Sequence, residues 1–324
     1  MFAAFLQRAI MQGIPLLYGS TGEIITEKSG NLNLGIPGIM YVGGISGVIG
    51  AFFYEHFSPA MNPFLAVLIP FLCSLVGSLL MGLIYSFLTV TLRANQNVTG
   101  LALTTFGVGI GNFFGGSLTR LVQSEVPSVS LPKTSAFFKT SLPFAKNLGV
   151  IGDIFFSHGF MVYLAILIAL VAAYILKRTR VGLHLRAVGE SPATADADGI
   201  NVSRYKYLAT CIGSMIAGLG GLYYVVDYVG VWSNDGFGDR GWLAIALVIF
   251  AVWRPNSAVL GSLLFGGLYI VHNYITGFGV AAQELFKMTP YVVTILVLII
   301  TSIREKRESQ PPQSLGLSYF REER

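Results

Sequence analysis

Two short polar stretches in this apolar chain carry the side chains best suited to chemistry. They are GEIITEKSGNLNLGIPGIM, residues 22–40, and GVWSNDGFGDRG, residues 230–241. An amide offers both a hydrogen-bond donor and an acceptor, and an indole offers a flat face for stacking. Five side chains are therefore candidates for holding a small polar solute: Asn31, Asn33, Trp232, Asn234 and Asp235. The alternative is that these residues only satisfy the polar groups of frayed helix ends.

The sequence lacks the patterns of catalysis, metal binding and nucleotide binding. It has no G-x-x-x-x-G-K-[ST] phosphate loop, no metal-ligand spacing, no Ser/His/Asp arrangement and no pair of carboxylates inside an expected span. Cys73 and Cys211 fall in apolar runs, where a thiol behaves as a small hydrophobic group. We therefore predict that the chain is not an enzyme and has no catalytic residue, metal site or cofactor.

The composition of the chain is that of a membrane protein. Hydrophobic residues make up 53% of the 324 positions and charged residues only 11%, against roughly 25% charged residues in a soluble domain. The net charge of +5 is explained by the gathering of Lys and Arg on the cytoplasmic side of membrane proteins, so we predict no nucleic-acid partner. Membrane lipid is the expected surrounding.

Long apolar runs predict a polytopic, all-α bundle of transmembrane helices with about 8–9 spans, because about 20 apolar residues cross a bilayer as a helix. The expected spans are 3–20, 34–53, 64–92, 98–117, 159–177, 205–227, 241–253, 257–276 and 289–303. The basic segment from Lys177 to Lys206 and the basic C-terminal tail are assigned to the cytoplasm. This topology starts the first span outside and indicates a multi-pass protein of the cell membrane.

The expected span 241–253 is too short to cross the membrane. Thirteen helical residues reach only about 20 Å, whereas the hydrocarbon core is about 30 Å thick. Both this helix and the helix 34–53 follow a polar, glycine-rich stretch, and the two run in opposite directions in the predicted topology. Two broken segments of opposite direction are typical of an inverted repeat. The alternative is that both stretches are short surface loops.

A helix break is predicted at the first polar stretch. Inside a helix, Gly costs ~1 kcal/mol and Pro ~3 kcal/mol relative to Ala, so Gly35, Pro37 and Gly38 together oppose a continuous helix by roughly 5 kcal/mol. Broken backbone at membrane depth is tolerated only where protein or water satisfies its polar groups. We therefore expect non-helical backbone within residues 29–37, facing protein or a cavity. Three charged residues are placed at its cytoplasmic mouth: Glu23, Glu27 and Lys28.

The stretch KRTRVGLHLRAVGESPATADADGINVSRYKY, residues 177–207, is predicted to hold a short cytoplasmic helix. Ser191 suits the N-cap, Pro192 the first turn and Gly199 the C-terminal stop, so residues 193–198 form about two turns. Three small residues on this helix would fit a cleft on another protein: Ala193, Ala195 and Ala197. The alternative is a solvated loop helix.

Glycines in the expected span 98–117 predict close helix packing. Gly107, Gly111 and Gly115 are four residues apart and therefore share one helix face, which lets another backbone approach. Ionisable residues are scarce inside the spans, whereas an ion-coupled carrier usually needs one there. This scarcity weighs against proton coupling, although sodium coupling through backbone carbonyls stays possible.

Three motifs resemble those of one known family, the permease subunits of nucleoside-type ABC importers, within the branched-chain amino acid and simple sugar permease family. SGNLNLGIPGIM is similar to the run S-G-x-x-N-[LI]-G-x-E-G-M-M, with matches at Ser29, Gly30, Asn33, Leu34, Gly35, Gly38 and Met40. Pro37 stands where the family usually has Glu, and Ile39 where it usually has Met.

The second and third motifs lie further along the chain. LRAVGESPATADADGINVSRYKY resembles the cytoplasmic coupling segment of the family, with matches at Arg186, Ala187, Val188, Gly189, Glu190, Pro192, Ala195, Gly199, Ile200 and Tyr205. GFGDRGWLAIALVIFAVWRP resembles the block G-x-G-[FW]-x-A-[IL]-A-x-x-x-F-x-x-W-[RK]-P, with matches at Gly241, Ala244, Ile245, Ala246, Phe250, Trp253, Arg254 and Pro255.

The resemblance implies a fold like that of type II ABC importers and a role as one half of a membrane channel. An ABC ATPase subunit would dock on the segment 184–200, a second related permease would complete a heterodimer, and an extracytoplasmic solute-binding lipoprotein would deliver the solute. The implied coupling residues are Arg186, Glu190, Pro192, Ala193, Ala195, Asp196 and Gly199. ATP hydrolysis would take place on the partner subunit.

We therefore predict a permease subunit of an ATP-driven importer for a small polar solute, with a nucleoside as the first candidate. The alternatives are a simple sugar or other small-solute permease, or a self-sufficient channel or ion-coupled carrier. The predicted domain organisation is one transmembrane domain over residues 1–304, with the coupling segment 178–204, followed by a polar cytoplasmic tail over 305–324.

Overall fold

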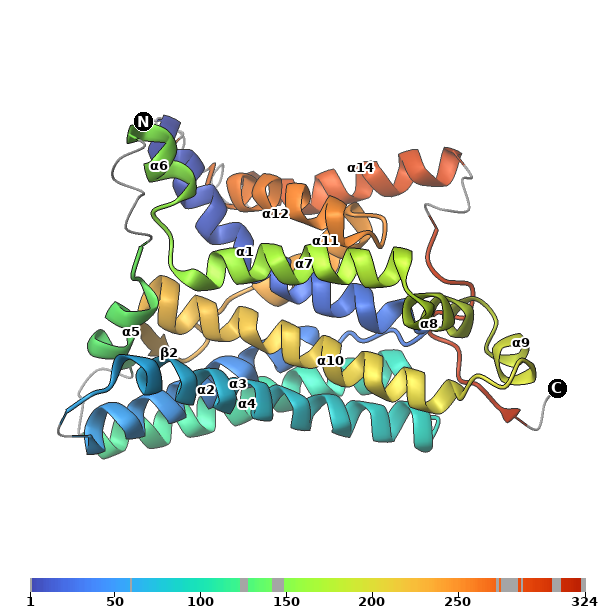
Figure 1. Ribbon diagram of the computed structural model, residues 1–324, viewed down its shortest axis with the longest axis horizontal. Coiled ribbons are helices and arrows are strands. Elements are labelled where there is room, and N and C mark those ends of the chain that lie inside the picture. Colours follow the sequence, from blue (N-terminus) through green and yellow to red (C-terminus); the bar gives the residue numbers. More distant parts are fainter. Residues whose placement is uncertain are drawn as a thin grey trace.

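A computed structural model describes residues 2–58, 60–122, 128–141, 149–271, 274, 285–286, 288–304 and 310–321. Its long helices lie side by side along one axis (Figure 1). Five helical stretches are long and apolar enough to cross a membrane: α2 (Ile36–Phe57), α3 (Pro63–Ser86) with η1 (Phe87–Thr91), α4 (Gln96–Val122), α7 (Phe160–Arg178), and α10 (Val202–Leu222) with η3 (Tyr223–Val229). The prediction of a polytopic helical membrane protein is confirmed.

Four further helices of the described residues belong to the bundle. They are α1 (Phe2–Glu27) and the shorter apolar helices α11 (Arg240–Phe250), α12 (Pro255–Ile270) and α14 (Thr289–Arg304). The 11-residue α11 confirms that the second broken segment leads into a helix too short to span a bilayer. The number of spans, 8–9, stays a prediction, and part of the expected span 257–276 lies outside the described residues.

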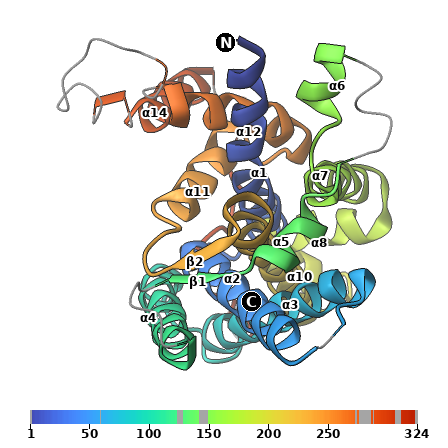
Figure 2. The ribbon, with the colours of Figure 1, turned by 90° about the vertical axis from the view of Figure 1, so that its left-hand side faces the viewer.

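The connecting elements lie at the two ends of the bundle. At one end are α5 (Pro132–Phe138), α6 (Gly149–Phe155) and the antiparallel pair of β1 (Ser128–Ser130) and β2 (Val231–Ser233), in which Val129 faces Trp232 (Figure 2). At the other end are α8 (Arg180–Glu190), α9 (Pro192–Ala197) and residues 310–321 (Figure 1). Following the charge-based topology, we call these the outer end and the inner end.

The core of the bundle is formed by α1, α2 and α10, whose backbones approach closely at small residues. A Cβ atom on Gly22 of α1 would lie 2.2 Å from the carbonyl oxygen of Gly213 in α10. A Cβ atom on Gly107 of α4 would lie 2.5 Å from the carbonyl oxygen of Gly38 in α2. The expectation that the glycine face of 98–117 serves helix packing is confirmed, because the start of α2 rests on it.

The predicted break between the first two helices is present. Helix α1 ends at Glu27, and turns and extended backbone fill residues 28–35 before α2 begins at Ile36. The side chains of Ser29, Asn31 and Asn33 are fully buried in protein. Pro37 lies in the first turn of α2, where a missing N–H costs nothing and a fixed φ favours the helix.

The first helix is longer than the expected span 3–20. It continues through Glu23 to Glu27 and contains Pro15. The placement of both glutamates at the cytoplasmic mouth is wrong, because Glu23 is 0% exposed and Glu27 is 3% exposed. Hydropathy ends the expected span before the polar stretch that contains Glu23, whereas packing against other helices lets the helix continue.

Bulk at Gly107 should disturb the packing of α2 on α4. A Cβ atom at Gly109 in the same helix would meet nothing within 4 Å, so this position is a matched control with the same cost in helix propensity. We expect Gly107→Val to lower the stability of the purified protein by about 1–3 kcal/mol more than Gly109→Val does. Thermal unfolding in detergent measures both variants, and equal losses would contradict the close contact.

Candidate functional site

A polar and aromatic cluster lies at the outer end, where α2, α4 and the loop after β2 meet. The Tyr41 hydroxyl donates to Asn112 Oδ1 at 2.5 Å and accepts from the backbone N–H of Asp235 at 2.8 Å. Asn112 Nδ2 donates to Asp235 Oδ1 at 3.1 Å. The ring of Trp232 meets that of Tyr41 edge to face, with centroids 4.9 Å apart. We call these four residues the outer cluster.

The outer cluster contains two of the five predicted solute-path residues and two that the sequence analysis missed. Trp232 is only 2% exposed, so its ring is covered by Tyr41 and by α4 and is not open for stacking in this conformation. Asn234 lies beside it, exposed, and accepts from Trp232 Nε1 at 3.4 Å. Asn112 could have been identified from the sequence, because it has the sole amide side chain within the expected span 98–117.

A buried arginine anchors the loop that carries the outer cluster. The Arg240 guanidinium lies 4.1 Å from the ring centre of Tyr224 and 5.0 Å from that of Tyr269, and it donates to the carbonyl oxygen of Phe237 at 2.7 Å. It also lies 3.4 Å from Gln12 Oε1. Such cation–π contacts are worth about 2 kcal/mol when desolvated. Arg240 therefore holds the backbone two residues beyond Asp235.

Asn31 and Asn33, the predicted solute-path residues of the first polar stretch, form hydrogen bonds that hold the break. Asn33 Oδ1 accepts from the backbone N–H of Gly35 at 2.9 Å, and Asn31 Nδ2 donates to Thr210 Oγ1 at 3.1 Å. Both side chains keep one buried polar atom without a partner among the described residues, Asn31 Oδ1 and Asn33 Nδ2. The break is therefore incompletely satisfied in this conformation.

A buried pair of carboxyl groups holds the break from the side of α1. Glu23 Oε1 accepts from the backbone N–H of Asn33 at 3.0 Å, and Glu27 accepts from the indole N–H of Trp253 after α11. The other carboxyl oxygen, Glu23 Oε2, is buried without a hydrogen-bond partner among the described residues. The sequence analysis expected no pair of carboxylates inside a span, and this pair lies beyond the expected span 3–20, in the last turns of the longer α1. The missed signal was the spacing of four residues, which brings two side chains together on one helix face.

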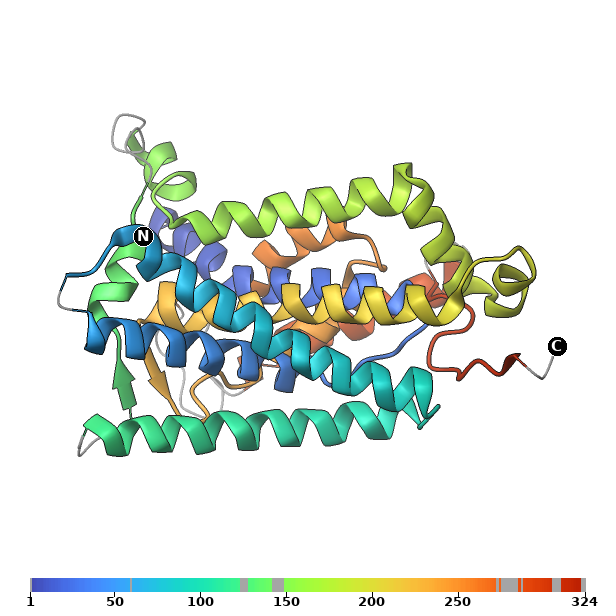
Figure 3. The ribbon, with the colours of Figure 1, turned by 60° about the horizontal axis from the view of Figure 1, so that its bottom comes forward.

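The two groups of predicted path residues lie in different parts of the fold, and α4 contacts both. Figure 3 shows α4, drawn in teal to green, running along the whole bundle. Its Gly100 faces the backbone of Leu34 in the break, whereas Gly115 faces the indole of Trp232 at the outer end. The break and the outer cluster are therefore two sites along one helix and do not form a single pocket.

The segment after α7 forms the predicted short helix at the inner end. Helix α9 spans Pro192–Ala197, the Ser191 hydroxyl accepts from the backbone N–H of Thr194, and Gly199 has a φ of +82°. The capping residues and the stop are those expected from the sequence. Arg186, Glu190, Ala193 and Gly199 are exposed.

Among the predicted coupling residues, Ala195 and Asp196 make contacts with other described residues of the same chain. Ala195 is 2% exposed and packs in a small apolar cluster with Val188 and Val202, so it supports α9 from within. Asp196 accepts from the hydroxyl of Tyr319 at 2.9 Å. Pro192 is half-buried, which leaves Ala193 and Ala197 as the exposed alanines available to a partner.

The inner-end segment touches the break directly. Gly189, at the end of α8, lies so close to the carbonyl of Lys28 that a Cβ atom there would be 2.3 Å from the oxygen. Burial lowers the pKa of the Lys28 ammonium, and the nearby carboxylate of Glu190 opposes that shift. Both the backbone and the charges therefore connect this segment to the residues that begin the break.

Comparison with known proteins decides the family. The model of the branched-chain amino acid transport system permease component matches residues 5–298. The chain belongs to this permease family. Three similar proteins cover almost all of it, and each is named as an ABC transporter permease.

The nucleoside permease NupC of Lactococcus lactis subsp. cremoris is 33% identical to this permease over 90% of each chain. The guanosine permease NupQ of Bacillus subtilis is 29% identical over 97% of this chain and 96% of its own. The putative glucose permease TsgC13 of Haloferax volcanii is 30% identical over 99% of both.

The three sequence motifs of the permease meet around the break. Gly189 of the second motif lies against Lys28, next to the first motif, and Gly241 of the third motif lies against Pro37 of the first. Trp253 of the third motif donates to Glu27 at the end of α1. Motifs far apart in the chain therefore converge on the place where α1 stops and α2 begins.

Loss of the Tyr41 hydroxyl should open the outer cluster. Tyr41→Phe removes the bonds to Asn112 and to the N–H of Asp235, at about 0.5–1.5 kcal/mol each. We expect a severalfold change in solute uptake at normal expression. Tyr54→Phe is the matched control, since Tyr54 also lies in α2 and accepts from a backbone N–H, that of Asn62. Equal uptake by both variants would exclude the outer cluster from the solute path.

Proposed function

We propose that this permease forms half of the translocation path of an ATP-driven importer for nucleosides. The observation that carries the proposal is the match of two permeases named for nucleosides and guanosine over nearly the whole chain. The chemistry of the two sites supports it. The two sites beside α4 contain buried amides, a carboxylate and aromatic rings. Such groups suit an uncharged solute that combines a flat heterocycle with hydroxyl groups.

In this proposal the solute passes from the outer cluster to the break. Trp232, Asn234 and Asp235 line the outer part of the path, and Asn31 and Asn33 line the inner part. The partnerless atoms Asn31 Oδ1 and Asn33 Nδ2 are the groups that a passing solute or water would satisfy. Asn112 and Tyr41 join the outer set because they fix Asp235.

The opposite directions of the two broken segments support the proposal of an inverted repeat of type II importers with 8–9 spans. Helix α2 starts at the inner break, α11 starts after the outer loop, and the two starts touch where Gly241 meets Pro37. Discontinuous helices that meet near the membrane centre are where many transporters bind solute. The division into a domain over 1–304 and a tail over 305–324 stays a prediction.

Energy would come from a separate ABC ATPase subunit docked on the segment 184–200. The exposed Arg186, Glu190 and Ala193 provide the docking face, and Gly189 passes the movement to Lys28. A second related permease would complete a heterodimer, and a solute-binding lipoprotein would deliver the solute at the outer end. The permease family of the chain supports these partners.

A sugar is the second candidate substrate, because TsgC13 is named for glucose and is matched over nearly its whole length. Amide, carboxylate and indole groups also suit a sugar ring. A self-sufficient channel or carrier is a third reading, in which uptake would need no ATP.

Uptake by the reconstituted complex distinguishes these substrates. With ATP inside vesicles, we expect accumulation of radiolabelled guanosine that unlabelled uridine or adenosine reduces and glucose does not. If glucose reduced the uptake and the unlabelled nucleosides did not, the result would favour a sugar permease. Uptake by this chain without ATPase and ATP would favour a channel or carrier and would overturn the proposal.

A bulky charge on the exposed face of α9 should weaken ATPase docking. We expect Ala193→Arg to lower ATP-driven uptake by about tenfold, as loss of an interface anchor worth about 1.4 kcal/mol would do. Ala136→Arg is the matched control, since Ala136 is an exposed alanine of the short helix α5 at the opposite end. Co-purification of the ATPase measures docking, and normal retention with Arg at 193 would contradict the assignment.

A further inference from the structure

Residues 314–321, which we call the strap, cross the inner end and contact three separate parts of the permease. Ser314 donates to the carbonyl oxygen of Gly189 with both its backbone N–H, at 3.0 Å, and its hydroxyl, at 2.6 Å. Two residues later, the N–H of Gly316 donates to the carbonyl oxygen of Gly30 at 3.2 Å. One turn of the strap therefore joins the end of α8 to the first residues of the break.

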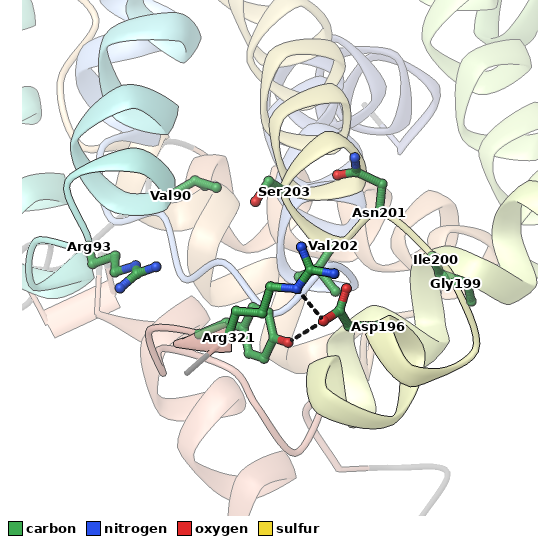
Figure 4. Close-up of a pocket in the computed structure, with 10 residues that line it drawn as sticks. Val90, Arg93, Asp196, Gly199, Ile200, Asn201, Val202, Ser203 and Arg321 are labelled. Carbon is green, nitrogen blue, oxygen red and sulfur yellow. Dashed lines mark hydrogen bonds and ion pairs between the residues drawn. The ribbon is translucent and has the colours of Figure 1, made fainter. Parts of the chain in front are cut away.

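The other end of the strap holds α9. Tyr319 packs on the apolar cluster of Ala195, and its hydroxyl donates to Asp196 Oδ2 at 2.9 Å. Arg321 Nε lies 3.2 Å from the same oxygen (Figure 4). The Asp196 side chain is 13% exposed, whereas that of Arg321 is 73% exposed. Water therefore weakens the ion pair, and the hydrogen bond from Tyr319 to Asp196 is the better shielded of the two interactions.

The strap also forms one wall of a cavity on the inner face. The cavity has a volume of about 430 Å³ and lies between α9, the start of α10 and the turn after η1 (Figure 4). Arg93 of that turn lies over the ring of Phe320 at 4.7 Å. The strap therefore borders open space between α9 and the turn. Between its two ends it is also held by Gln96 Nε2, which donates to the carbonyl oxygen of Leu317 at 3.3 Å, and by the Ser318 hydroxyl, which donates to the carbonyl oxygen of Arg93 at 3.4 Å.

These contacts give α9 two connections to the break. One runs through the end of α8, which directly precedes α9 and whose Gly189 contacts Lys28, and the other is the strap. Coupling between distant sites is carried by elements that are packed or hydrogen-bonded into a contiguous network. The strap thus links Asp196 of α9, through Tyr319 and Gly316, to the carbonyl group of Gly30.

We propose that the strap is a positioning element of the coupling machinery, which carries the displacement of α9 to the break so that solute movement follows ATP hydrolysis. The inference rests on the proposed function, because it assigns the strap a part in ATP-driven transport. Tyr319 and Arg321 act through Asp196, and Ser314 and Gly316 act through the backbone of Gly189 and Gly30.

The first test measures nucleosides moved per ATP hydrolysed by the complete complex in vesicles. The double variant Tyr319→Phe/Arg321→Gln keeps the packing of the ring but removes both bonds to Asp196, and we expect this ratio to fall about threefold to tenfold. Arg321→Lys preserves the ion pair and should retain most of the ratio. Leu317→Ala is the matched control, because this side chain belongs to the strap but is 62% exposed.

The second test needs no solute. Hydrogen exchange of the amides of residues 28–35 is compared with and without ATP in the complex with the ATPase. We expect ATP to change this exchange in the wild type and to change it much less in the double variant. An equal change in both would overturn the strap as a connection.

The outcomes separate the two proposals. A wild-type complex that moves nucleosides, with an unchanged ratio in the double variant, overturns the strap and leaves the nucleoside importer standing. A wild-type complex that moves no nucleoside overturns the proposed substrate, and the exchange measurement then decides about the strap. Co-purification of the ATPase and thermal unfolding of each variant show that a lost ratio does not come from a misfolded chain.

Discussion

The fold depends on how the backbone of residues 28–35 is satisfied inside the bundle. Peptide groups that leave a helix at membrane depth must find partners in protein or water. Here Glu23 accepts from the N–H of Asn33, Asn33 accepts from that of Gly35, and Gln96 accepts from that of Leu32 at 2.7 Å. The partners come from α1, from the break itself and from α4, so the break can exist only where these helices converge.

Close approach of backbones gives that convergence its geometry. Lipid tails are as apolar as leucine side chains, so helices in a membrane associate through tight packing and hydrogen bonds rather than through burial from water. Gly22 brings α1 onto α10, and Gly107 brings α4 onto the first turn of α2. Helix α4 thereby connects the break with the outer cluster, which lies along the same helix but is built from different elements.

In the proposed importer, the inner end is where a separate ATPase subunit would act on the permease. Helix α9 is a separate, capped element whose buried Ala195 ties it to the chain while Ala193 stays exposed. The end of α8 touches Lys28, where helix α1 has just ended. A displacement of this segment therefore acts on backbone that is outside any helix and is easier to rearrange than a continuous one.

The features that could be predicted from the sequence are those set by interactions between residues close together in the chain. Glycine and proline oppose helix within a few residues of themselves, so the break at residues 28–35 and the short α9 with Ser191 and Gly199 followed from propensity and capping alone. The four-residue spacing of Gly107, Gly111 and Gly115 likewise determined one packing face. Charge and composition determined the class of the protein.

Only the tertiary structure decided which polar side chains meet. Glu23 and Glu27 were assigned to the cytoplasmic mouth, yet contacts with Asn33 and with Trp253, 226 residues away, bury them. Tyr41 packs against the ring of Trp232, and Val188 and Val202 pack against Ala195. Neither side chain is therefore free in the way that the sequence suggested. Burial and partnership depend on elements far apart in the chain, and one-dimensional spacing contains no information about their distance in space.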